Sequence, residues 1–483
     1  MSADIPIIRL YHGQIEIKTP LCIGAGNPEG LEGVAQIFRD GRGEGIIPGK
    51  TISGVFFEDL EWFQNIEWLQ DKDINTDIFL KSWMGLSGKL SRQRLLNEHN
   101  KGRSALRFAS APITTSNSKY GVRDRIRLNS ATRTVDDKAK FAQEQVIAGT
   151  CFDFELEIEI MFLFPQSSDQ TVKDELRDNL RIKILSQIEQ VLKKWMTEGF
   201  FLGGSSSAGN GWALLCDLKK WDVKNDTYDD FLALKTNHYI PVLNESSIYQ
   251  RDVSIKFEIT LNNDNSNWGL DFIEIHQGDQ YAFTSELDAP FYTEWQINNN
   301  NSSDRNCEEY FIIPGSSLRG AMRAFLSSYF PEKYIDLWFG KALLGDEGSR
   351  SLIRIRDAKG ETVKSSEKLI VRSHAEDEFI GSTFESSLFD HCPLLKGSFS
   401  GEMRYPSIYI NNFHNTDRED WFSWAFKMLH LEEAGFSKNK DNWIKDALLE
   451  LPNALNFFFE QAGKNRVCLG HGGGHAKWVI KKT

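Results

Sequence analysis

The chain has 483 residues, of which 40% are hydrophobic and 26% charged, so it has the composition of a globular protein and the length for two ordinary domains. Its formal net charge of −12 argues against a simple nucleic-acid coat, because affinity for phosphate comes from clustered Lys and Arg. The six cysteines include no Cys-x-x-Cys pair, which argues against a disulfide framework or zinc site and favours a reduced, cytoplasmic protein. We expect no membrane contact, because no apolar run could cross a bilayer and the first residues lack a signal-peptide pattern.

A tight turn between a strand and a helix is the first informative pattern along the chain. The segment Gly45-Ile-Ile-Pro-Gly49 predicts a short strand that ends in a Pro–Gly turn, and the run Val55 to Phe63 predicts the helix that follows. Backbone N–H groups in the first turn of a helix have no partner within the helix. They are therefore suited to bind an anion such as phosphate.

A basic stretch follows between Lys89 and Arg133, where Lys and Arg far outnumber Asp and Glu. Two interpretations remain open, a local basic groove on an acidic body and a solvated charged face. Arg123, Arg125 and Arg127 alternate along a strand-like segment, so their side chains point to the same side. This spacing favours a row of arginines that faces phosphate.

The first half ends in a strand, a helix and a glycine-rich loop. Alternating apolar residues predict a half-buried strand at Ala148 to Leu156, and a helical segment spans Val172 to Glu198. The loop from Phe201 to Trp212 then carries several glycines, including Gly203 and Gly204, which allow a backbone to approach a ligand closely. A turn without a ligand remains the simpler interpretation of such a loop taken alone.

The second half repeats the patterns of the first half in the same order, which predicts two modules. Their boundary is expected near Tyr239 to Arg251, so the first module spans residues 1–240 and the second spans residues 250–483. Each is predicted to be an α+β sandwich with helices on one face of an antiparallel sheet. The repeated segments of the second half are Phe311 to Gly320, Trp338 to Gly340, Leu352 to Ile355, Val371 to Arg372, Lys396 to Met403, Arg418 to Ala434 and Cys468 to Trp478.

The turn Ile313-Pro-Gly-Ser-Ser-Leu-Arg-Gly320 and the loop Leu469-Gly-His-Gly-Gly-Gly474 together resemble the RAMP superfamily of CRISPR effector proteins. The chain looks like the backbone subunits of type III complexes and, because two modules are fused, like those of the type III-D variants. The resemblance implies a ferredoxin-like (RRM-like) core in each module and a stack of modules along a guide RNA. It also implies hairpin "thumbs" that flip a base of the guide, at the insertions Ser116 to Val146 and Ser373 to Leu388.

The resemblance further implies a ribonuclease site in the second module. Asp288, in the segment Ser285 to Tyr292, matches the catalytic aspartate of the family, whereas Ala35 stands at that place in the first module, which we expect not to cleave. Family members need Mg²⁺ or another divalent metal, and an Asp oxygen suits that cation better than it suits general-base chemistry at neutral pH. Taken alone, Asp288 would be interpreted as a turn residue that caps its own backbone before Pro290.

The residues expected to contact RNA lie in the turns, the basic stretch, the thumbs and the glycine-rich loops. For Arg319 and Arg323, an exposed helix face is an equally good interpretation. His471 and His475 lack a third ligand nearby, so we expect no metal pair there. The full set is Lys50, Arg107, Arg123, Arg125, Arg127, Gly203, Gly204, Ser316, Arg319, Arg323, Arg372, His374, Gly470, Gly472 and Gly473.

The predicted function is that of a backbone subunit of an RNA-guided complex, with guide RNA, target RNA and other CRISPR effector subunits as partners. Pairing between guide and target would then supply the sequence specificity. Three alternatives remain open: a structural or cap RAMP that does not cut, a guide-processing endoribonuclease that uses Tyr11 and His12, and a metabolic enzyme with a duplicated ferredoxin-like fold. The metabolic enzyme should have a pocket of convergent ionisable groups, and the sequence offers no such cluster.

Overall fold

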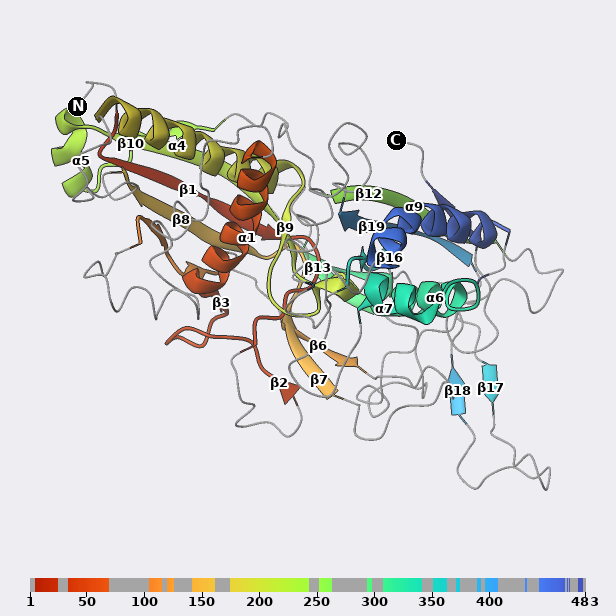
Figure 1. Ribbon diagram of the computed structural model, residues 1–483. Helices are drawn as coiled ribbons and strands as arrows, with labels where there is room; N and C mark the ends of the chain where they lie inside the picture. Colours follow the sequence, from red (N-terminus) through yellow and green to blue (C-terminus); the bar gives the residue numbers. More distant parts are fainter. Residues whose placement is uncertain are drawn as a thin grey trace.

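The computed structural model contains two large antiparallel sheets, each accompanied by helices (Figure 1). All described strands of the first sheet precede residue 243, and all those of the second follow residue 251; these parts are called the first and second module. The structure describes residues 5–24, 34–68, 104–114, 120–125, 141–160, 174–242, 252–262, 293–297, 307–340, 351–362, 371–373, 389–391, 396–406, 431, 443–464, 467, 469 and 477–480.

The first sheet is built around β1 (Ile8–Ile17), along which buried and partly exposed residues alternate. β1 pairs with β10 (Trp212–Val223) on one side and with β8 (Cys151–Glu159) on the other, and β4 (Leu106–Phe108) pairs with β8. The order across the sheet is β11-β10-β1-β8-β4, where β11 is Ile240–Pro241, and β9 (Phe200–Phe201) also pairs with β10.

Helices α1 (Gly49–Trp68) and α4 (Asp174–Thr197) cover one face of this sheet (Figure 1). Trp195 of α4 is fully buried and meets Phe56 of α1 edge-on, with 5.6 Å between the ring centroids. The Nε1 atom of Trp195 donates a hydrogen bond of 2.7 Å to Asp59, which also pairs with a lysine of α4. This buried carboxylate is therefore paired between the two helices, as an acidic group in a core must be.

The second sheet repeats this arrangement around β12 (Asp252–Asn262). β12 pairs antiparallel with β19 (Lys396–Pro406) and β20 (Lys477–Ile480), and β15 (Arg354–Ile355) pairs with β19. The sheet continues from β19 through β16 and β14 to β13. The other strands and helices of this module are β13 (Thr293–Ile297), β14 (Cys307–Ile313), β16 (Ala358–Thr362), α6 (Gly315–Leu326), α7 (Glu332–Phe339) and α9 (Trp443–Ala462).

Both modules present equivalent elements in the same order. The first has β1, α1, β4, β8, α4 and β10, and the second has β12, α6, β15, β19, α9 and β20. Across the sheets these strands are arranged as β10-β1-β8-β4 and as β20-β12-β19-β15. The predicted combination of helices with antiparallel sheets in a tandem arrangement is therefore confirmed.

The second module contains one helix that the sequence analysis did not predict. The helix predicted over Arg418 to Ala434 falls outside the described residues, apart from Leu431. In the first module α4 follows β8. In the second module the described helix that follows β19 is α9, which contains Pro452 in its interior. Its buried residues Ile444, Leu448, Leu451, Leu455 and Phe458 follow helical spacing, so the apolar face continues past the proline. Among the helices in the described part of the chain, none is long and apolar enough to cross a membrane.

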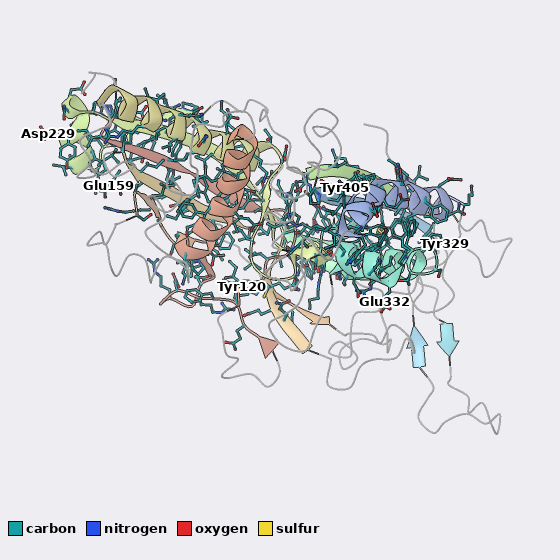
Figure 2. All side chains as sticks on the ribbon, in the orientation of Figure 1. Tyr120, Glu159, Asp229, Tyr329, Glu332 and Tyr405 are labelled. Atoms are coloured by element: carbon teal, nitrogen blue, oxygen red, sulfur yellow. The ribbon has the colours of Figure 1, made fainter. Side chains whose placement is uncertain are left out.

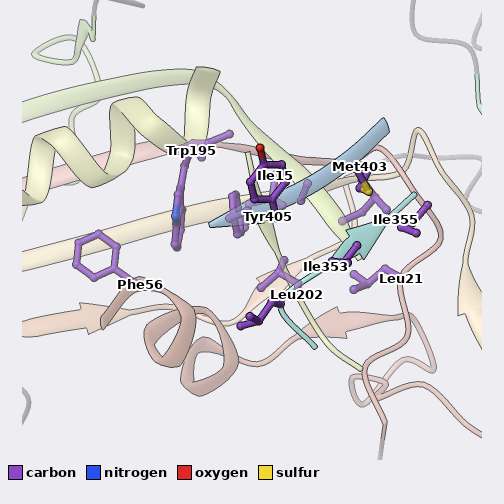
Figure 3. Close-up of a cluster of buried hydrophobic side chains, with 14 of the residues drawn as sticks. Ile15, Leu21, Phe56, Trp195, Leu202, Ile353, Ile355, Met403 and Tyr405 are labelled. Carbon is purple, nitrogen blue, oxygen red and sulfur yellow. The ribbon is translucent and has the colours of Figure 1, made fainter. Parts of the chain in front are cut away.

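One apolar core runs through both modules. Leu21 and Leu202 of the first module and Ile353, Ile355 and Met403 of the second belong to a single cluster of buried side chains (Figure 3). Burial of apolar surface contributes roughly 25 cal/mol per Å². Core packing therefore holds the two modules against each other as one unit.

Two β-hairpins stand off the main sheets. β6 (Tyr120–Arg125) pairs with β7 (Phe141–Val146), and β17 (Val371–Ser373) pairs with β18 (Phe389–His391). The first hairpin lies between β4 and β8 in the chain, the second lies between β15 and β19, and both project from the same side of the molecule (Figure 1). The remaining short elements are β2 (Val34–Ala35), β3 (Ile46–Ile47), β5 (Ala111–Pro112), a 3-10 turn at Ser206–Ala208, another at Asn225–Thr227, and α5 (Tyr228–Leu232).

Candidate nucleic-acid interface

Both Pro–Gly turns are present, and both require glycine for the same reason. A Cβ atom on Gly49 would lie 2.2 Å from the carbonyl oxygen of Phe108, and one on Gly315 would lie 2.3 Å from that of Ile355. Any other residue would push the helix away from the neighbouring backbone. The turns therefore hold the N-termini of α1 and α6 tightly against β4 and β15.

The first N–H group of each of these helices has a partner in the segment after the neighbouring strand. Gly49 N donates to Ser110 Oγ at 3.2 Å, and Gly315 N donates to Asp357 Oδ1 at 2.6 Å. Lys50 and Ser316 are the next residues of the two helices, and both are exposed. Each helix thus exposes one residue of its first turn, where the positive partial charge of a helix N-terminus suits a phosphate.

The face of the first sheet that the helices leave open is acidic. Asp153, Glu155, Glu157 and Glu159 alternate along β8 and are partly or fully exposed. Arg107 on β4 forms an ion pair of 3.2 Å with Glu157 and a second one with Glu159. Arg107 is therefore already paired, and a phosphate backbone would be repelled by this face.

One group of possible metal ligands gathers on the same acidic face, among the residues that the structure describes. His12 Nε2 lies 3.1 Å from Asp153 Oδ1, and Glu155 brings the third ligand atom within 4.8 Å of the other two. These residues belong to β1 and β8 of the first module. The group is therefore not the metal site predicted at Asp288 of the second module.

The glycine-rich loop of the first module packs against protein backbone on both sides. Gly203 has a φ of +71°, and a Cβ atom there would lie 2.1 Å from the carbonyl oxygen of Cys22. Gly209 has a φ of +84°, and its Cβ would lie 2.3 Å from the carbonyl oxygen of Ile355 in the second module. Gly203 and Gly204 are the two residues of this loop that were predicted to contact RNA, and of these two only Gly204 has room for an added Cβ atom. Close packing between backbones is thus a sufficient reason for glycine at 203 and 209.

Arg123 lies at the junction of the modules, and its side chain is buried. Its guanidinium donates to Asp357 Oδ2 at 2.7 Å and to Glu294, both of the second module. It also donates to Asn210 in the glycine-rich loop at 3.2 Å. The alternating arginines of this segment predict a row that faces phosphate. The guanidinium of Arg123, however, is bound by Glu294 and Asp357. We therefore leave Arg123 out of the proposed RNA interface.

Three further arginines of the second module line this junction, and the sequence analysis did not single them out. The guanidinium groups of Arg356 and Arg404 lie over the indole ring of Trp212, and that of Arg354 lies over Phe201. Arg356 Nη1 also forms an ion pair of 2.7 Å with Glu402. Burial holds the pKa of Arg356 below its usual value, even though Glu402 opposes the shift. Arginine stacked on aromatic rings is a common way to bury a cation at an interface.

Arg319 and Arg323 of α6 tie that helix to α7. Arg319 donates to the carbonyl oxygen of Phe339, and Arg323 donates to that of Gly340 at 3.1 Å. Arg323 also forms an ion pair of 2.9 Å with Asp336. Cations at a helix C-terminus satisfy its free carbonyl groups and complement its dipole. Both arginines thus have structural partners, and the side chain of Arg323 is also 36% exposed, so their contact with RNA stays a prediction.

The base of the first hairpin is anchored by Tyr120, which is labelled in Figure 2. Its hydroxyl accepts a hydrogen bond of 3.0 Å from Gly45 N and donates one of 2.9 Å to Glu44. The guanidinium of Arg39 lies 4.4 Å from the centre of the Tyr120 ring and pairs with Glu144 of β7. The hairpin is therefore attached to the segment that leads into the first Pro–Gly turn.

The other residues predicted to act on RNA are placed only in part. Arg125 lies in β6 and Arg372 lies in β17. Outside the described residues lie Asp288, Arg127, His374, Gly470, Gly472 and Gly473. These assignments remain predictions.

Comparison with known proteins gives one match. The model of the RAMP superfamily matches residues 14–214 and 293–477, which is most of the chain. The first region contains α1, β4, β8 and α4, and the second contains the corresponding α6, β15, β19 and α9, so each includes one Pro–Gly turn. No curated protein matches the chain.

Proposed function

This chain belongs to the RAMP superfamily, and on that premise we propose that it is a fused backbone subunit of a type III CRISPR effector complex. Membership implies a CRISPR-associated subunit that binds RNA. The match to two separate regions indicates that one polypeptide carries two such modules. A chain of this kind would cover two consecutive stretches of a guide RNA.

The observation that carries this proposal is the doubled module with a hairpin at the equivalent place in each copy. Each module follows the order strand, helix, strand, strand, helix, strand, with the fourth strand beside the first in the sheet. This is the topology expected of a ferredoxin-like core. The hairpins β6–β7 and β17–β18 project from the same side (Figure 1), as two thumbs on one guide would have to do.

Charge on the described surface favours one path for the guide. The open face of the first sheet carries four acidic residues of β8, so phosphates are disfavoured there. The first turns of α1 and α6 present Lys50 and Ser316 to solvent instead. We propose that the guide backbone passes along the exposed Lys50 and Ser316 and the bases of the two hairpins, while the protein reads backbone and shape.

We also propose that the second module cleaves target RNA at Asp288. In this reaction the 2′-oxygen of the target loses its proton to solvent and attacks the adjacent phosphorus, the bond from phosphorus to the 5′-oxygen breaks, and the 5′-oxygen takes up a proton from solvent. The products are a 2′,3′-cyclic phosphate and a free 5′-hydroxyl. A carboxylate oxygen of Asp288 is a ligand that Mg²⁺ prefers, and the metal would supply positive charge near the phosphate. Ala35 at the matching place argues that the first module does not cut.

The test is cleavage of a guide-complementary target RNA by the reconstituted complex with Mg²⁺, comparing wild type with Asp288→Ala. We expect one cleavage site to disappear, with activity there reduced at least a hundredfold, while the chain still binds guide RNA. Cleavage that is unchanged at every site would identify the chain as a structural or cap subunit. Replacing Mg²⁺ by EDTA should abolish cleavage and leave guide binding intact.

The structure disfavours guide processing through Tyr11. Tyr11 is 1% exposed and lies on the face of β1 that points to the helices. Burial raises the pKa of its hydroxyl far above the usual value. An RNA bound outside the core has no access to this group, so Tyr11 would be a poor acid or base for cutting it.

A further inference from the structure

Within this chain, the Pro–Gly turn of the second module is covered by the glycine-rich loop of the first. A Cβ atom on Gly209 would lie 2.4 Å from the Cα atom of Arg356, and one on Gly315 would lie 2.5 Å from the carbonyl oxygen of Ala208. The loop backbone therefore lies directly on the turn and on the end of β15. Neither glycine leaves room for a side chain.

This contact hides the residues beneath the loop. Arg356 is 8% exposed, and the side chain of Asp357 is 5% exposed. Asp357 accepts hydrogen bonds both from Gly315 of its own module and from Arg123 of the first module. The covered turn is thus an interface between two modules, with backbone contact at its centre and an ion pair beside it.

The first module carries a turn of the same geometry. The turn glycine approaches a strand carbonyl to nearly the same distance in both copies, at Phe108 in the first and Ile355 in the second. It also donates its N–H to the side chain two residues further on, which is Ser110 in the first copy and Asp357 in the second. Ala109 is therefore the counterpart of Arg356.

In the first module, however, this surface is open. Ala109 and Ser110 are exposed, whereas their counterparts in the second module are covered. Both are small and uncharged, so no side chain obstructs close approach by another backbone. Ser110 also replaces the carboxylate that receives Arg123, so an occupant needs no arginine at that place.

We propose that the surface formed by Gly49, Ala109 and Ser110 is a docking site for the glycine-rich loop of another RAMP module. The module pair inside this chain is the template, since Ala208 and Gly209 of the glycine-rich loop already lie on the same turn in the second copy. The occupant must be rich in glycine, because at this distance a Cβ atom collides with the turn. The inference rests on the proposed function, in which a backbone subunit assembles with other modules. It adds the orientation of neighbouring modules: the first module of this chain would receive the loop of the module next to it.

The experiment uses the ribonucleoprotein purified through a tag on this chain, with Ala109 replaced by the photoreactive amino acid p-benzoylphenylalanine. After irradiation, digestion and mass spectrometry, we expect position 109 to be linked to a peptide containing the glycine-rich loop of a RAMP module. The same amino acid at Leu449, which is 53% exposed on α9, is the control and should not link to such a loop. A link from 109 to RNA or to another kind of peptide, or no link at all, would overturn the docking site.

A second variant measures the contact without a photoreactive group. Ala109→Trp places a bulky side chain on the surface and should reduce the amount of copurifying RAMP subunits at least tenfold. Leu449→Trp should leave it unchanged, and both purified variants should unfold at the temperature of wild type. Equal recovery of these subunits with Ala109→Trp would contradict the proposal. Guide RNA in the complexes is measured separately: its absence from wild type would contradict the proposed function, whereas its presence without a link from 109 contradicts only the docking site.

Discussion

Several arginines predicted to contact RNA have structural partners within the protein. Arg123 joins carboxylates of the second module to the first hairpin, while Arg319 and Arg323 bind the C-terminal carbonyl groups of α7. The planar guanidinium suits carboxylates, carbonyl oxygens and phosphates alike. The type and spacing of these residues therefore indicate that each guanidinium binds an anion or a carbonyl dipole. The packing of the chain decides which group that is.

Replacing Arg123 should test this structural role directly. Arg123→Ala leaves Glu294 and Asp357 with side chains only 13% and 5% exposed and without this cation. We expect the free energy of unfolding to fall by about 3–5 kcal/mol, the usual result of removing one partner of a buried ion pair. Denaturant unfolding measures the change, and the exposed Arg42→Ala should shift it by less than about 0.5 kcal/mol. Weaker guide binding at unchanged stability would instead assign Arg123 to phosphate.

At the scale of secondary-structure elements, the glycine-rich loop of the first module acts as a connector between two modules. Its backbone passes between the segment around Cys22 and the end of β15, and the 3-10 turn Ser206–Ala208 contacts the start of α6. Thr19 Oγ1 donates a hydrogen bond of 2.7 Å to the carbonyl oxygen of Gly209, which fixes the loop from its other side. Glycines here serve close packing of backbone against backbone.

Two glycines of this loop offer a matched comparison. Gly209→Ala forces a left-handed φ of +84° on a residue whose Cβ has no room, so we expect a loss of at least about 1–3 kcal/mol in the free energy of unfolding. Gly204→Ala should cost less than about 0.5 kcal/mol, because nothing lies within 4 Å of its added Cβ. Urea unfolding of both variants gives the comparison. Equal free energies of unfolding for the two variants would show that close packing of Gly209 against the second module does not stabilise the chain.

At the scale of the whole molecule, the two modules share a core and an electrostatic environment. The net charge of −12 is compatible with RNA binding because acidic residues of β8 gather on the open sheet face, away from the exposed Lys50 and Ser316. Charges of both modules also meet at the junction. Burial raises the pKa of Glu198 to about 6, and Asp252 of the second module adds to this rise.

This raised pKa predicts how the stability of the assembled chain depends on pH. Between about pH 4.5, the ordinary pKa, and about 6, the folded chain binds more protons at Glu198 than the unfolded chain does. The free energy of unfolding therefore falls as pH rises through this window. Glu198→Gln should remove this dependence and be more stable than wild type by about 1 kcal/mol at pH 7, after allowance for solvent screening. Urea unfolding at both ends of the window measures it, with the exposed Glu361→Gln as control.

The sequence by itself determined the duplication, the antiparallel sheets with helices, and the two Pro–Gly turns. These features are local: alternating apolar residues define strands, and Gly49 and Gly315 mark turns whose chemistry lies within a few residues. They also carried the resemblance that the superfamily match bears out. The helix α9, with its internal Pro452, was not among the predicted elements.

Only the tertiary structure decided which partners the candidate site residues meet. Arg123 and Asp357 are 234 residues apart in the chain, and Gly209 meets the end of β15 across the same junction. Such contacts depend on how two folded modules pack, and no periodicity within one segment encodes that packing. A pattern along the chain shows the direction in which a side chain points, whereas its neighbour is set by the shared core that brings distant segments together.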